Sequence, residues 1–285
     1  MPFPIESSWL FAAACGIFGL LIGSFLNVVI HRVPIILQRE DDRYLAERSA
    51  TPGPMSERFD LVVPRSRCPS CGHQITALEN IPLLSYVRLG GKCSACGARI
   101  GIRYPAVEAL AGLLSLVVAV FLGPAWRTVF ALVFVYFLIA LTFIDVDTQL
   151  LPDRLTIPLL WLGLLVNLST FGFASLPSAV LGAAAGYLSL WLVYWIFRLA
   201  TGKEGMGYGD FKLLAAIGAW LGWEMLLLVI LLASVAGALI GIVLMIAARR
   251  GKDIPLPFGP YLAIAGFVAL LFGPQLVQSY LALYP

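Results

Sequence analysis

The sequence is poor in charged residues. Only 12% of its 285 residues are Asp, Glu, Lys or Arg, and 60% are hydrophobic, whereas about 25% charged and about 45–50% apolar residues are usual in soluble domains. Apolar runs of about 18 residues or more recur along most of the chain, and a run of that length crosses the hydrocarbon of a bilayer as a helix. This composition excludes an ordinary soluble fold and predicts an integral membrane protein.

Basic residues are missing where two other classes of protein would need them. The opening segment MPFPIESSW contains Glu6 and no Lys or Arg, so it lacks the basic region of a cleavable signal peptide, and we expect the first apolar run to be a retained helix. The net charge is only +3, and no basic cluster is interleaved with aromatic residues. Nucleic acid is therefore not an expected partner.

Long apolar windows bounded by Gly, Pro or charge predict an all-α polytopic protein with about eight transmembrane helices. The windows lie at residues 9–30, 105–123, 128–144, 155–172, 177–197, 211–223, 225–247 and 258–282. Between the first two, residues 31–104 hold no spanning run. We expect three parts: the first transmembrane helix in 1–30, a small polar insert in 31–104, and a seven-helix membrane domain in 105–285.

Small residues recur within two of these windows and predict close helix packing, because residues of this size let membrane helices approach each other. They are Gly16, Gly19 and Gly23 in the first window, and Gly182, Ala185 and Gly186 in the fifth.

The basic residues also predict the orientation, because Lys and Arg accumulate on the cytoplasmic side of membrane proteins. With the N-terminus outside, cytoplasmic segments hold eleven basic residues in 31–104, one in 145–154, three in 198–212 and three in 248–257, which is eighteen of the nineteen. Only Arg127 lies on the other side. We therefore expect the insert to face the cytoplasm.

Acidic residues within membrane helices are costly and usually functional. Asp145 ends the third window, roughly 27 Å along the helix from Arg127 at 1.5 Å per residue, and Asp210 opens the sixth. Two carboxylates in a poorly solvated site share a proton, as aspartic proteolysis requires, and Gly207 and Gly209 would let a substrate strand approach. A proton relay in a transporter is the alternative use of such a pair.

Two further acids lie between the third and fourth windows, at Asp147 and Asp153. Either could be a supporting group of the same site. Each could equally be an interfacial acid that favours the positive end of a helix dipole.

The insert carries two C-x-x-C pairs, RCPSCGH and KCSACGA. Four thiolates in two short turns match a structural zinc site of the zinc-ribbon type, with Cys68, Cys71, Cys93 and Cys96 as ligands. A redox-active C-x-x-C pair is the alternative. His73 would be a ligand only if a cysteine were absent, and Cys15 in the first window is expected to be a packing residue.

With these residues the chain resembles the type IV prepilin peptidase family, the bifunctional leader peptidases and N-methyltransferases of pilus and type II secretion systems. The resemblance covers nearly the whole chain, through GSFLNVVIHR, ENIPLLSYVRLGGKC, RYPAVE, IDVDTQLLPDRLT, TGKEGMGYGDFKLL and PLPFGPYLAIAG. It implies that Asp145 and Asp210 are the two catalytic aspartates, the second within the family's GxGD sequence at residues 207–210.

The same resemblance implies an enzyme of the bacterial inner membrane. Its substrates would be prepilins and pseudopilins with a short basic leader that ends in Gly before a mature residue that is usually Phe. The new N-terminus would then be methylated from S-adenosylmethionine, and the four-Cys insert is typical of bifunctional members.

The methyl-transfer site cannot be located from the sequence pattern, because no glycine-rich cofactor loop follows a strand. The resemblance offers Asn27, Glu79, Asn80, Lys92 and Glu108 as candidates. Glu108 lies about one turn inside the second window, and structural pairing with Arg103 is the alternative to a functional role.

Two other classes of function are compatible with parts of the sequence. A proton-coupled transporter would use Asp145 and Asp210 as a relay and would predict internal repeats, none of which is convincing here. A membrane anchor whose zinc domain binds a protein partner would leave the paired acids unexplained.

Overall fold

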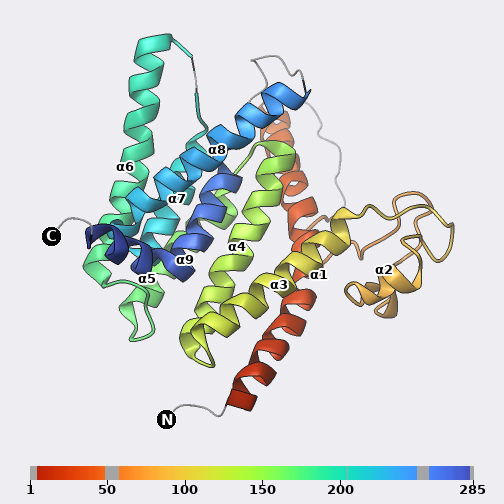
Figure 1. The fold of residues 1–285 in the computed structure, drawn as a ribbon. Helices are drawn as coiled ribbons and strands as arrows, with labels where there is room; N and C mark the ends of the chain where they lie inside the picture. Colours follow the sequence, from red (N-terminus) through yellow and green to blue (C-terminus); the bar gives the residue numbers. More distant parts are fainter. Residues whose placement is uncertain (1–4, 49–57, 204, 249–256, 283–285) are drawn as a thin grey trace. The chain divides into compact units, whose positions relative to one another are not determined.

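The computed structural model describes residues 5–48, 58–203, 205–248 and 257–282, and they are mainly helical (Figure 1). No β-sheet forms in these ranges; two isolated bridges, Arg67 with Gln74 and Lys92 with Arg99, are the extended pairings. The chain divides into two compact units, residues 1–124 and 125–285.

In the first unit, helix α1 (Ile5–Arg48) packs along helix α3 (Arg103–Leu122). The predicted small residues make this contact possible: a Cβ on Gly23 would lie 2.7 Å from the Cα of Glu108, and one on Gly19 would lie 2.7 Å from the carbonyl oxygen of Ala111. Close packing at Gly16, Gly19 and Gly23 is thereby confirmed.

Helix α1 continues well beyond the apolar window that ends at residue 30. Its last part, IILQREDDRYLAER, is polar and solvent-exposed on most positions, but Leu, Gln, Arg, Glu and Ala favour helix by intrinsic propensity. Apolarity therefore marks the part of α1 suited to the membrane, and propensity carries the helix on to Arg48.

The rest of the insert is held by short elements. A 3-10 turn, η1 (Leu78–Asn80), and a one-turn helix, α2 (Leu84–Arg88), connect the two cysteine-bearing loops. Arg32 of α1 holds the segment that precedes the first cysteine loop. Its guanidinium is buried and donates to the carbonyl oxygens of Asp60 at 2.8 Å and Pro64 at 2.6 Å.

The second unit is a bundle of six helices, and the shortest of them lies at its centre. The helices are α4 (Trp126–Thr148), α5 (Asp153–Leu168), α6 (Leu176–Thr201), α7 (Tyr208–Leu221), α8 (Leu226–Ala248) and α9 (Gly259–Leu281). Helix α7 packs against α5, α6 and α9, and nearly all of its side chains are buried.

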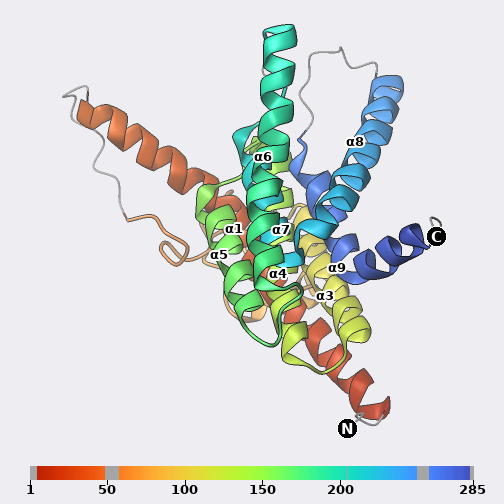
Figure 2. The same ribbon diagram turned by 90° about the vertical axis from the view of Figure 1, so that its left-hand side faces the viewer.

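Small residues again permit the closest contact in this unit. A Cβ on Gly186 of α6 would lie 2.7 Å from the carbonyl oxygen of Leu214 in α7, and Gly182 faces Gly218 of α7 in the same way. The close packing predicted at Gly182 and Gly186 is confirmed. Figure 2 shows α6 and α8 extending past the end of the shorter α7 and diverging from each other.

Each of the eight predicted windows coincides with a helix, but the windows are not equivalent. Six of the described helices, α1, α3, α4, α6, α8 and α9, are long and apolar enough to cross a membrane. Helices α5 and α7 have 16 and 14 residues and fall short of a full span. The chain is therefore a multi-pass membrane protein with six candidate spans and two shorter helices.

Candidate active site and metal centre

Asp145 lies in the last turn of α4 and is only 5% exposed. The helix ends three residues later, where Gln149 takes a left-handed conformation and donates its N–H to the carbonyl oxygen of Asp145 at 2.8 Å. The carboxylate accepts a hydrogen bond of 2.9 Å at Oδ2 from the backbone N–H of Gly259, the first residue of α9. Two helix ends therefore converge on this acid.

Asp210 lies in the first turn of α7 and is 7% exposed. Gly207 is the N-cap residue, in extended conformation, and its carbonyl oxygen accepts the N–H of Asp210 at 3.2 Å. The GxGD sequence is thus the turn that leads the chain into a buried helix. It places a carboxylate at the positive end of that helix.

The structure brings Asp145 and Asp210 together, close enough for the charge of Asp145 to act on Asp210. Leu151 lies between the segments that carry them: a Cβ on Gly209 would lie 2.7 Å from Leu151 Cβ, and one on Gly259 would lie 3.2 Å from Leu151 Cδ1. The site therefore forms where α4, α7, α9 and the link before α5 meet.

The two neighbouring acids differ from this pair in their surroundings. Asp147 is exposed, two residues beyond Asp145. Asp153 is exposed in the first turn of α5 and forms an ion pair with Lys212, whose Nζ lies 2.6 and 2.8 Å from the two carboxylate oxygens. The Asp153 carboxylate thus joins α5 to the second turn of α7, at Lys212, two residues beyond Asp210.

Two buried carboxylates that each accept a backbone N–H, Asp145 from Gly259 and Asp210 from Gly207, can perform general acid–base chemistry. When two such groups interact closely, they readily hold one proton between them. One group can then take a proton from water while the other gives a proton to a carbonyl oxygen.

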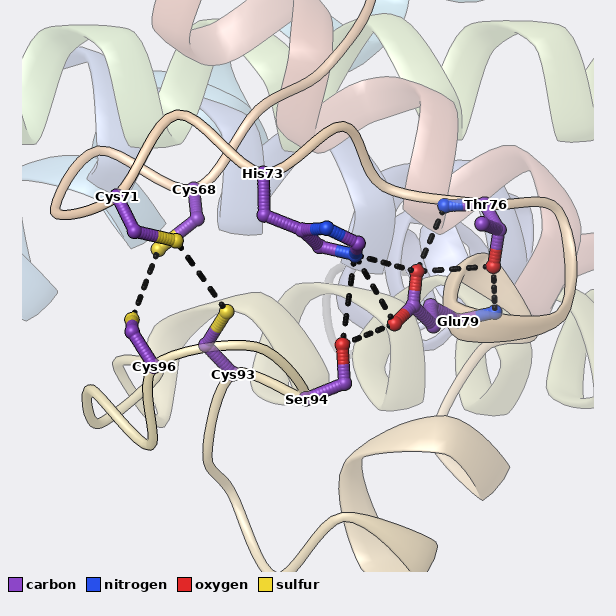
Figure 3. Close-up of polar contacts among 8 residues, drawn as sticks. All are labelled: Cys68, Cys71, His73, Thr76, Glu79, Cys93, Ser94 and Cys96. Carbon is purple, nitrogen blue, oxygen red and sulfur yellow. Dashed lines mark hydrogen bonds and ion pairs between the residues drawn. The ribbon is translucent and has the colours of Figure 1, made fainter.

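The four cysteines of the insert form a compact cluster in the first unit (Figure 3). The Sγ atoms of Cys68 and Cys96 are 3.8 Å apart, and those of Cys71 and Cys93 are 4.0 Å apart. These separations are too long for disulfides. They match the roughly 3.8 Å between sulfurs around a tetrahedral zinc ion with bonds of about 2.3 Å.

The two cysteine loops have the same backbone design. In each, the residue after the second cysteine is a glycine with positive φ, Gly72 at 73° and Gly97 at 71°. Its N–H donates to the carbonyl oxygen of the first cysteine, at 2.9 Å in both loops. The repeated turn aims both sulfurs of a pair at one point, as a metal site requires.

The opposed pKa shifts of neighbouring cysteine thiols also favour binding of a cation at the cluster. Backbone N–H groups of Cys71 and Ser70 lower the pKa of the Cys68 thiol to about 6. The backbone N–H of His73 lowers the pKa of the Cys71 thiol too, but the neighbouring sulfurs and burial outweigh it and raise this pKa to about 12. A bound metal ion would remove this mutual opposition between the thiolates.

His73 and Glu79 belong to a hydrogen-bond network beside the cluster (Figure 3). The Glu79 carboxylate accepts from the Ser94 hydroxyl, from the N–H and hydroxyl of Thr76 at 2.8 Å each, and lies 3.3 Å from His73 Nε2. These hydrogen bonds, led by Ser94 and Thr76, lower the pKa of Glu79 to about 2. Glu79 thus connects the two cysteine loops, and the His73 ring contacts that carboxylate.

Three other predicted candidates lie in the first unit. Glu108 Oε2 accepts the N–H of Leu83 at 2.9 Å, and Ser24 also bonds to the Glu108 carboxylate. Asn80 Oδ1 accepts from Ser24 at 3.3 Å, and Asn27 donates to the carbonyl oxygen of Tyr104 at 3.0 Å. Lys92 is exposed in the second cysteine loop.

Comparison with known proteins identifies the family to which this architecture belongs. Residues 17–122 match the profile of the bacterial peptidase A24 N-terminal domain, and residues 132–242 match that of the type IV leader peptidase family. The chain belongs to the type IV leader peptidase family. The predicted resemblance is confirmed.

Relatives in this family are similar over nearly their whole length. A prepilin leader peptidase/N-methyltransferase of Aeromonas salmonicida is 57% identical over 96% of this chain and 95% of its own. Proteins of the same name from Stutzerimonas stutzeri and Pseudomonas aeruginosa are 57% and 54% identical, over 93% and 92% of this chain and 92% and 91% of theirs. No solved structure matches the chain. The family supports the peptidase interpretation and not the transporter alternative.

One contributor to the site was missed by the sequence analysis. Gly259 contributes a backbone N–H, which has no side-chain signature, and the Gly-Pro sequence at 259–260 indicated only a helix start. The signal available was the position of this pair at the beginning of an apolar window. That position alone does not say which group the N–H will meet.

Proposed function

We propose that this protein removes the leader peptides of type IV prepilins and pseudopilins and then N-methylates the new N-terminal residue, usually Phe. Membership of the leader peptidase family and the names of relatives at 54–57% identity support both activities. The protein would thereby serve pilus assembly or type II secretion.

Asp145 and Asp210 are the proposed catalytic pair. The observation that carries this assignment is that two acids 65 positions apart in the sequence are both buried and meet at adjoining helix ends. One carboxylate would take a proton from the attacking water, and the other would protonate the carbonyl oxygen of the scissile peptide. The absence of a Cβ at Gly207 leaves the space beside Asp210 Oδ2 open to a substrate backbone, whereas the Cβ position of Gly209 is taken by Leu151.

The active site would face the cytoplasm in the bacterial inner membrane, with the N-terminus outside. Eighteen of the nineteen basic residues lie on the assigned cytoplasmic segments. A basic leader would stay on that side, while the apolar helix that follows it lies in the bilayer. The cleavage point between them would then reach the helix ends that carry the two aspartates.

Zinc is the proposed metal of the insert, held by Cys68, Cys71, Cys93 and Cys96. Its chemistry would be structural, because four thiolates fill a tetrahedral shell and leave no position for substrate. Metal binding would stabilise the cysteine-bearing part of the insert, residues 58–102, whose helical elements are the short η1 and α2.

S-adenosylmethionine is the proposed methyl donor, and it would supply an electrophilic methyl group on a sulfonium. The methyl-transfer site is assigned to the first unit, where Ser24 contacts both Asn80 and Glu108, with Asn27 on the same helix as Ser24. This separates methylation from the carboxylate pair of the second unit.

The test uses purified full-length protein in detergent with a prepilin peptide and, separately, a peptide already lacking its leader. Asp145→Asn and Asp210→Asn should each lower cleavage by at least about 1000-fold and keep methylation of the processed peptide. Asp147→Asn is the matched control and should cut within about twofold of wild type, because Asp147 is exposed. Wild-type cleavage by either variant of the pair would refute its assignment.

A further inference from the structure

A cluster of polar groups in the first unit gathers around a carboxylate in a membrane helix. We call it the Glu108 cluster; it consists of Ser24 of α1, Asn80 and Leu83 of the insert, and Glu108 of α3. Ser24 contacts both Glu108 and Asn80, and Leu83 donates its N–H to Glu108. Three segments far apart in the sequence therefore contribute to one site.

The backbone at Leu83 is held in a conformation that residues with a Cβ rarely adopt. Its φ is 58° and its ψ is −45°, and the N–H of Leu84 donates to the carbonyl oxygen of Pro82 at 2.6 Å. These values describe a γ-turn of the strained, positive-φ kind. Strain of this sort is retained where surrounding structure enforces it, which is most often at functional sites. Here the turn presents its N–H to the Glu108 carboxylate.

The charge of Glu108 meets only neutral donors among its described contacts. The Leu83 N–H and the Ser24 hydroxyl bond to it, and neither supplies a positive charge. Glu108 is partly buried near the start of α3, a candidate membrane span, where an anion gains from a cationic partner. The cluster is therefore suited to a cation that arrives with the substrate.

We propose that the Glu108 cluster binds the free α-ammonium group of the processed substrate and orients it for methylation. This inference rests on the proposed methyltransferase activity. An ammonium group has up to three N–H donors, and the cluster offers acceptors in the Glu108 carboxylate and Asn80 Oδ1. S-adenosylmethionine carries an α-ammonium group of its own, so the experiment must distinguish binding of the peptide amine from binding of the methyl donor.

The carboxylate also has a use beyond binding. An α-amino group has a pKa of about 7.7–8.0 and is mostly protonated at neutral pH, and a protonated amine has no lone pair for attack. Glu108 Oε1 can take one ammonium proton, while Oε2 stays bonded to Leu83. The nitrogen lone pair is then free. Glutamine would keep the hydrogen bond to Leu83 through its amide oxygen but would lack the charge and the basicity.

The experiment compares wild type, Glu108→Gln and the control Glu47→Gln, an exposed acid of the same unit, all as full-length protein in detergent. Two fluorescent peptides with a mature N-terminal Phe are titrated, one with a free amine and one N-acetylated. Cleavage of a prepilin peptide and methylation of the free-amine peptide are measured on the same preparations.

Wild type and Glu47→Gln should bind the free-amine peptide about 10- to 100-fold more tightly than the acetylated one, as expected for a charge-assisted contact. Glu108→Gln should bind both peptides equally, lose methylation by about 100-fold or more and keep cleavage within about twofold. Retained cleavage would show that the variant is folded.

A Glu108→Gln protein that keeps both its preference for the free amine and its methylation would overturn the inference. So would a variant that keeps the preference but loses binding of S-adenosylmethionine, since the cluster would then serve the donor. If wild type itself neither cuts nor methylates, the proposed function fails instead, and the two failures are distinguishable.

Discussion

The backbone N–H of Gly259 donates a 2.9 Å hydrogen bond to Oδ2 of Asp145 in a buried setting. This contact joins the first residue of α9 to the last turn of α4, across 114 positions of sequence. It fixes one carboxylate of the proposed catalytic pair without using any side chain. The N-terminal end of α9 also presents its positive dipole end to that carboxylate.

Replacing Gly259 by alanine should therefore disturb cleavage selectively. The added Cβ would lie 2.6 Å from Asp145 Oδ2 and 3.2 Å from Leu151 Cδ1, so the carboxylate must move. A catalytic group displaced by about 1 Å can lower the rate about 100-fold. We therefore expect Gly259→Ala to cut prepilin peptide roughly 10- to 100-fold more slowly. Single-turnover cleavage assays would measure this.

Gly266→Ala is the matched control for that change. It lies in the same helix, and its Cβ would meet only the flexible end of Ile217, at 3.1 Å, so cleavage should stay within about threefold of wild type. Methylation of a processed peptide should be unchanged in both variants. Equal cleavage by the two variants would show that the Gly259 contact does not position Asp145.

The sequence predicted the two aspartates because acids are scarce in its apolar windows, so each one stood out. Backbone donors leave no such mark, and for that reason the contacts of Gly259 with Asp145 and of Leu83 with Glu108 were missed. The N–H of Leu83 is available to Glu108 because of the γ-turn at this residue. Neither contact could be derived from residue types, because both depend on where distant segments come together.

Helix ends were predictable to different degrees for a related reason. The windows located the membrane part of every long helix, but polar helix formers extend α1 to Arg48, where hydropathy carries no signal. Conversely, α7 reads as an apolar window yet has only 14 residues. The predicted window of α7, residues 211–223, was already short, and the structure explains this length, because α7 is buried among α5, α6 and α9.

Asn167 should be a major source of stability in the second unit. Its side chain is buried and donates to the carbonyl oxygens of Ala219 and Trp220 at 2.8 and 2.9 Å, while Oδ1 accepts the N–H groups of Phe173 and Ala174. Removal leaves several buried backbone groups unpaired, each costing about 1–3 kcal/mol. We expect Asn167→Ala to lower the free energy of unfolding by about 2–4 kcal/mol.

Equilibrium unfolding in detergent, followed by tryptophan fluorescence, would measure that loss. Gln275→Ala in α9 is the control, because Gln275 is exposed and should change stability by less than about 0.5 kcal/mol. A loss below 1 kcal/mol for Asn167→Ala would mean that water replaces the amide at the end of α7.

The stability of the turn at residues 60–63, which precedes the first cysteine loop, should depend on pH. Hydrogen bonds from the N–H groups of Val63 and Val62, helped by Arg58, lower the pKa of Asp60 from 3.8 to about 2. The stabilisation by this carboxylate is therefore fully present above about pH 4 and is lost as the pH falls through about 2. Hydrogen–deuterium exchange of the Val62 and Val63 amides should show protection that declines between those values.

Asp60→Asn supplies the control for this prediction, since its side chain does not titrate. Protection in the variant should be weaker at pH 5 and should not follow the same decline. Protection of the wild-type turn that stays constant down to pH 2 would indicate that the Arg32 contacts to the Asp60 and Pro64 carbonyl oxygens hold it without the carboxylate.

The four-cysteine cluster should bind one zinc ion per chain. Elemental analysis of wild type should give about one equivalent, and Cys71→Ser combined with Cys96→Ser should remove it, because two of the four thiolates are lost. Without metal the insert should open, since metal binding stabilises folded domains of this kind by several kcal/mol, and trypsin should then cut after Arg65 or Arg67.

His73→Ala should keep the metal, because the described polar contacts of the His73 ring are with Glu79 and Ser94. Wild-type protein that is folded, active and free of metal would contradict the assignment, whereas loss of zinc from His73→Ala alone would make the Glu79 network part of what holds the two cysteine loops at metal-binding distance.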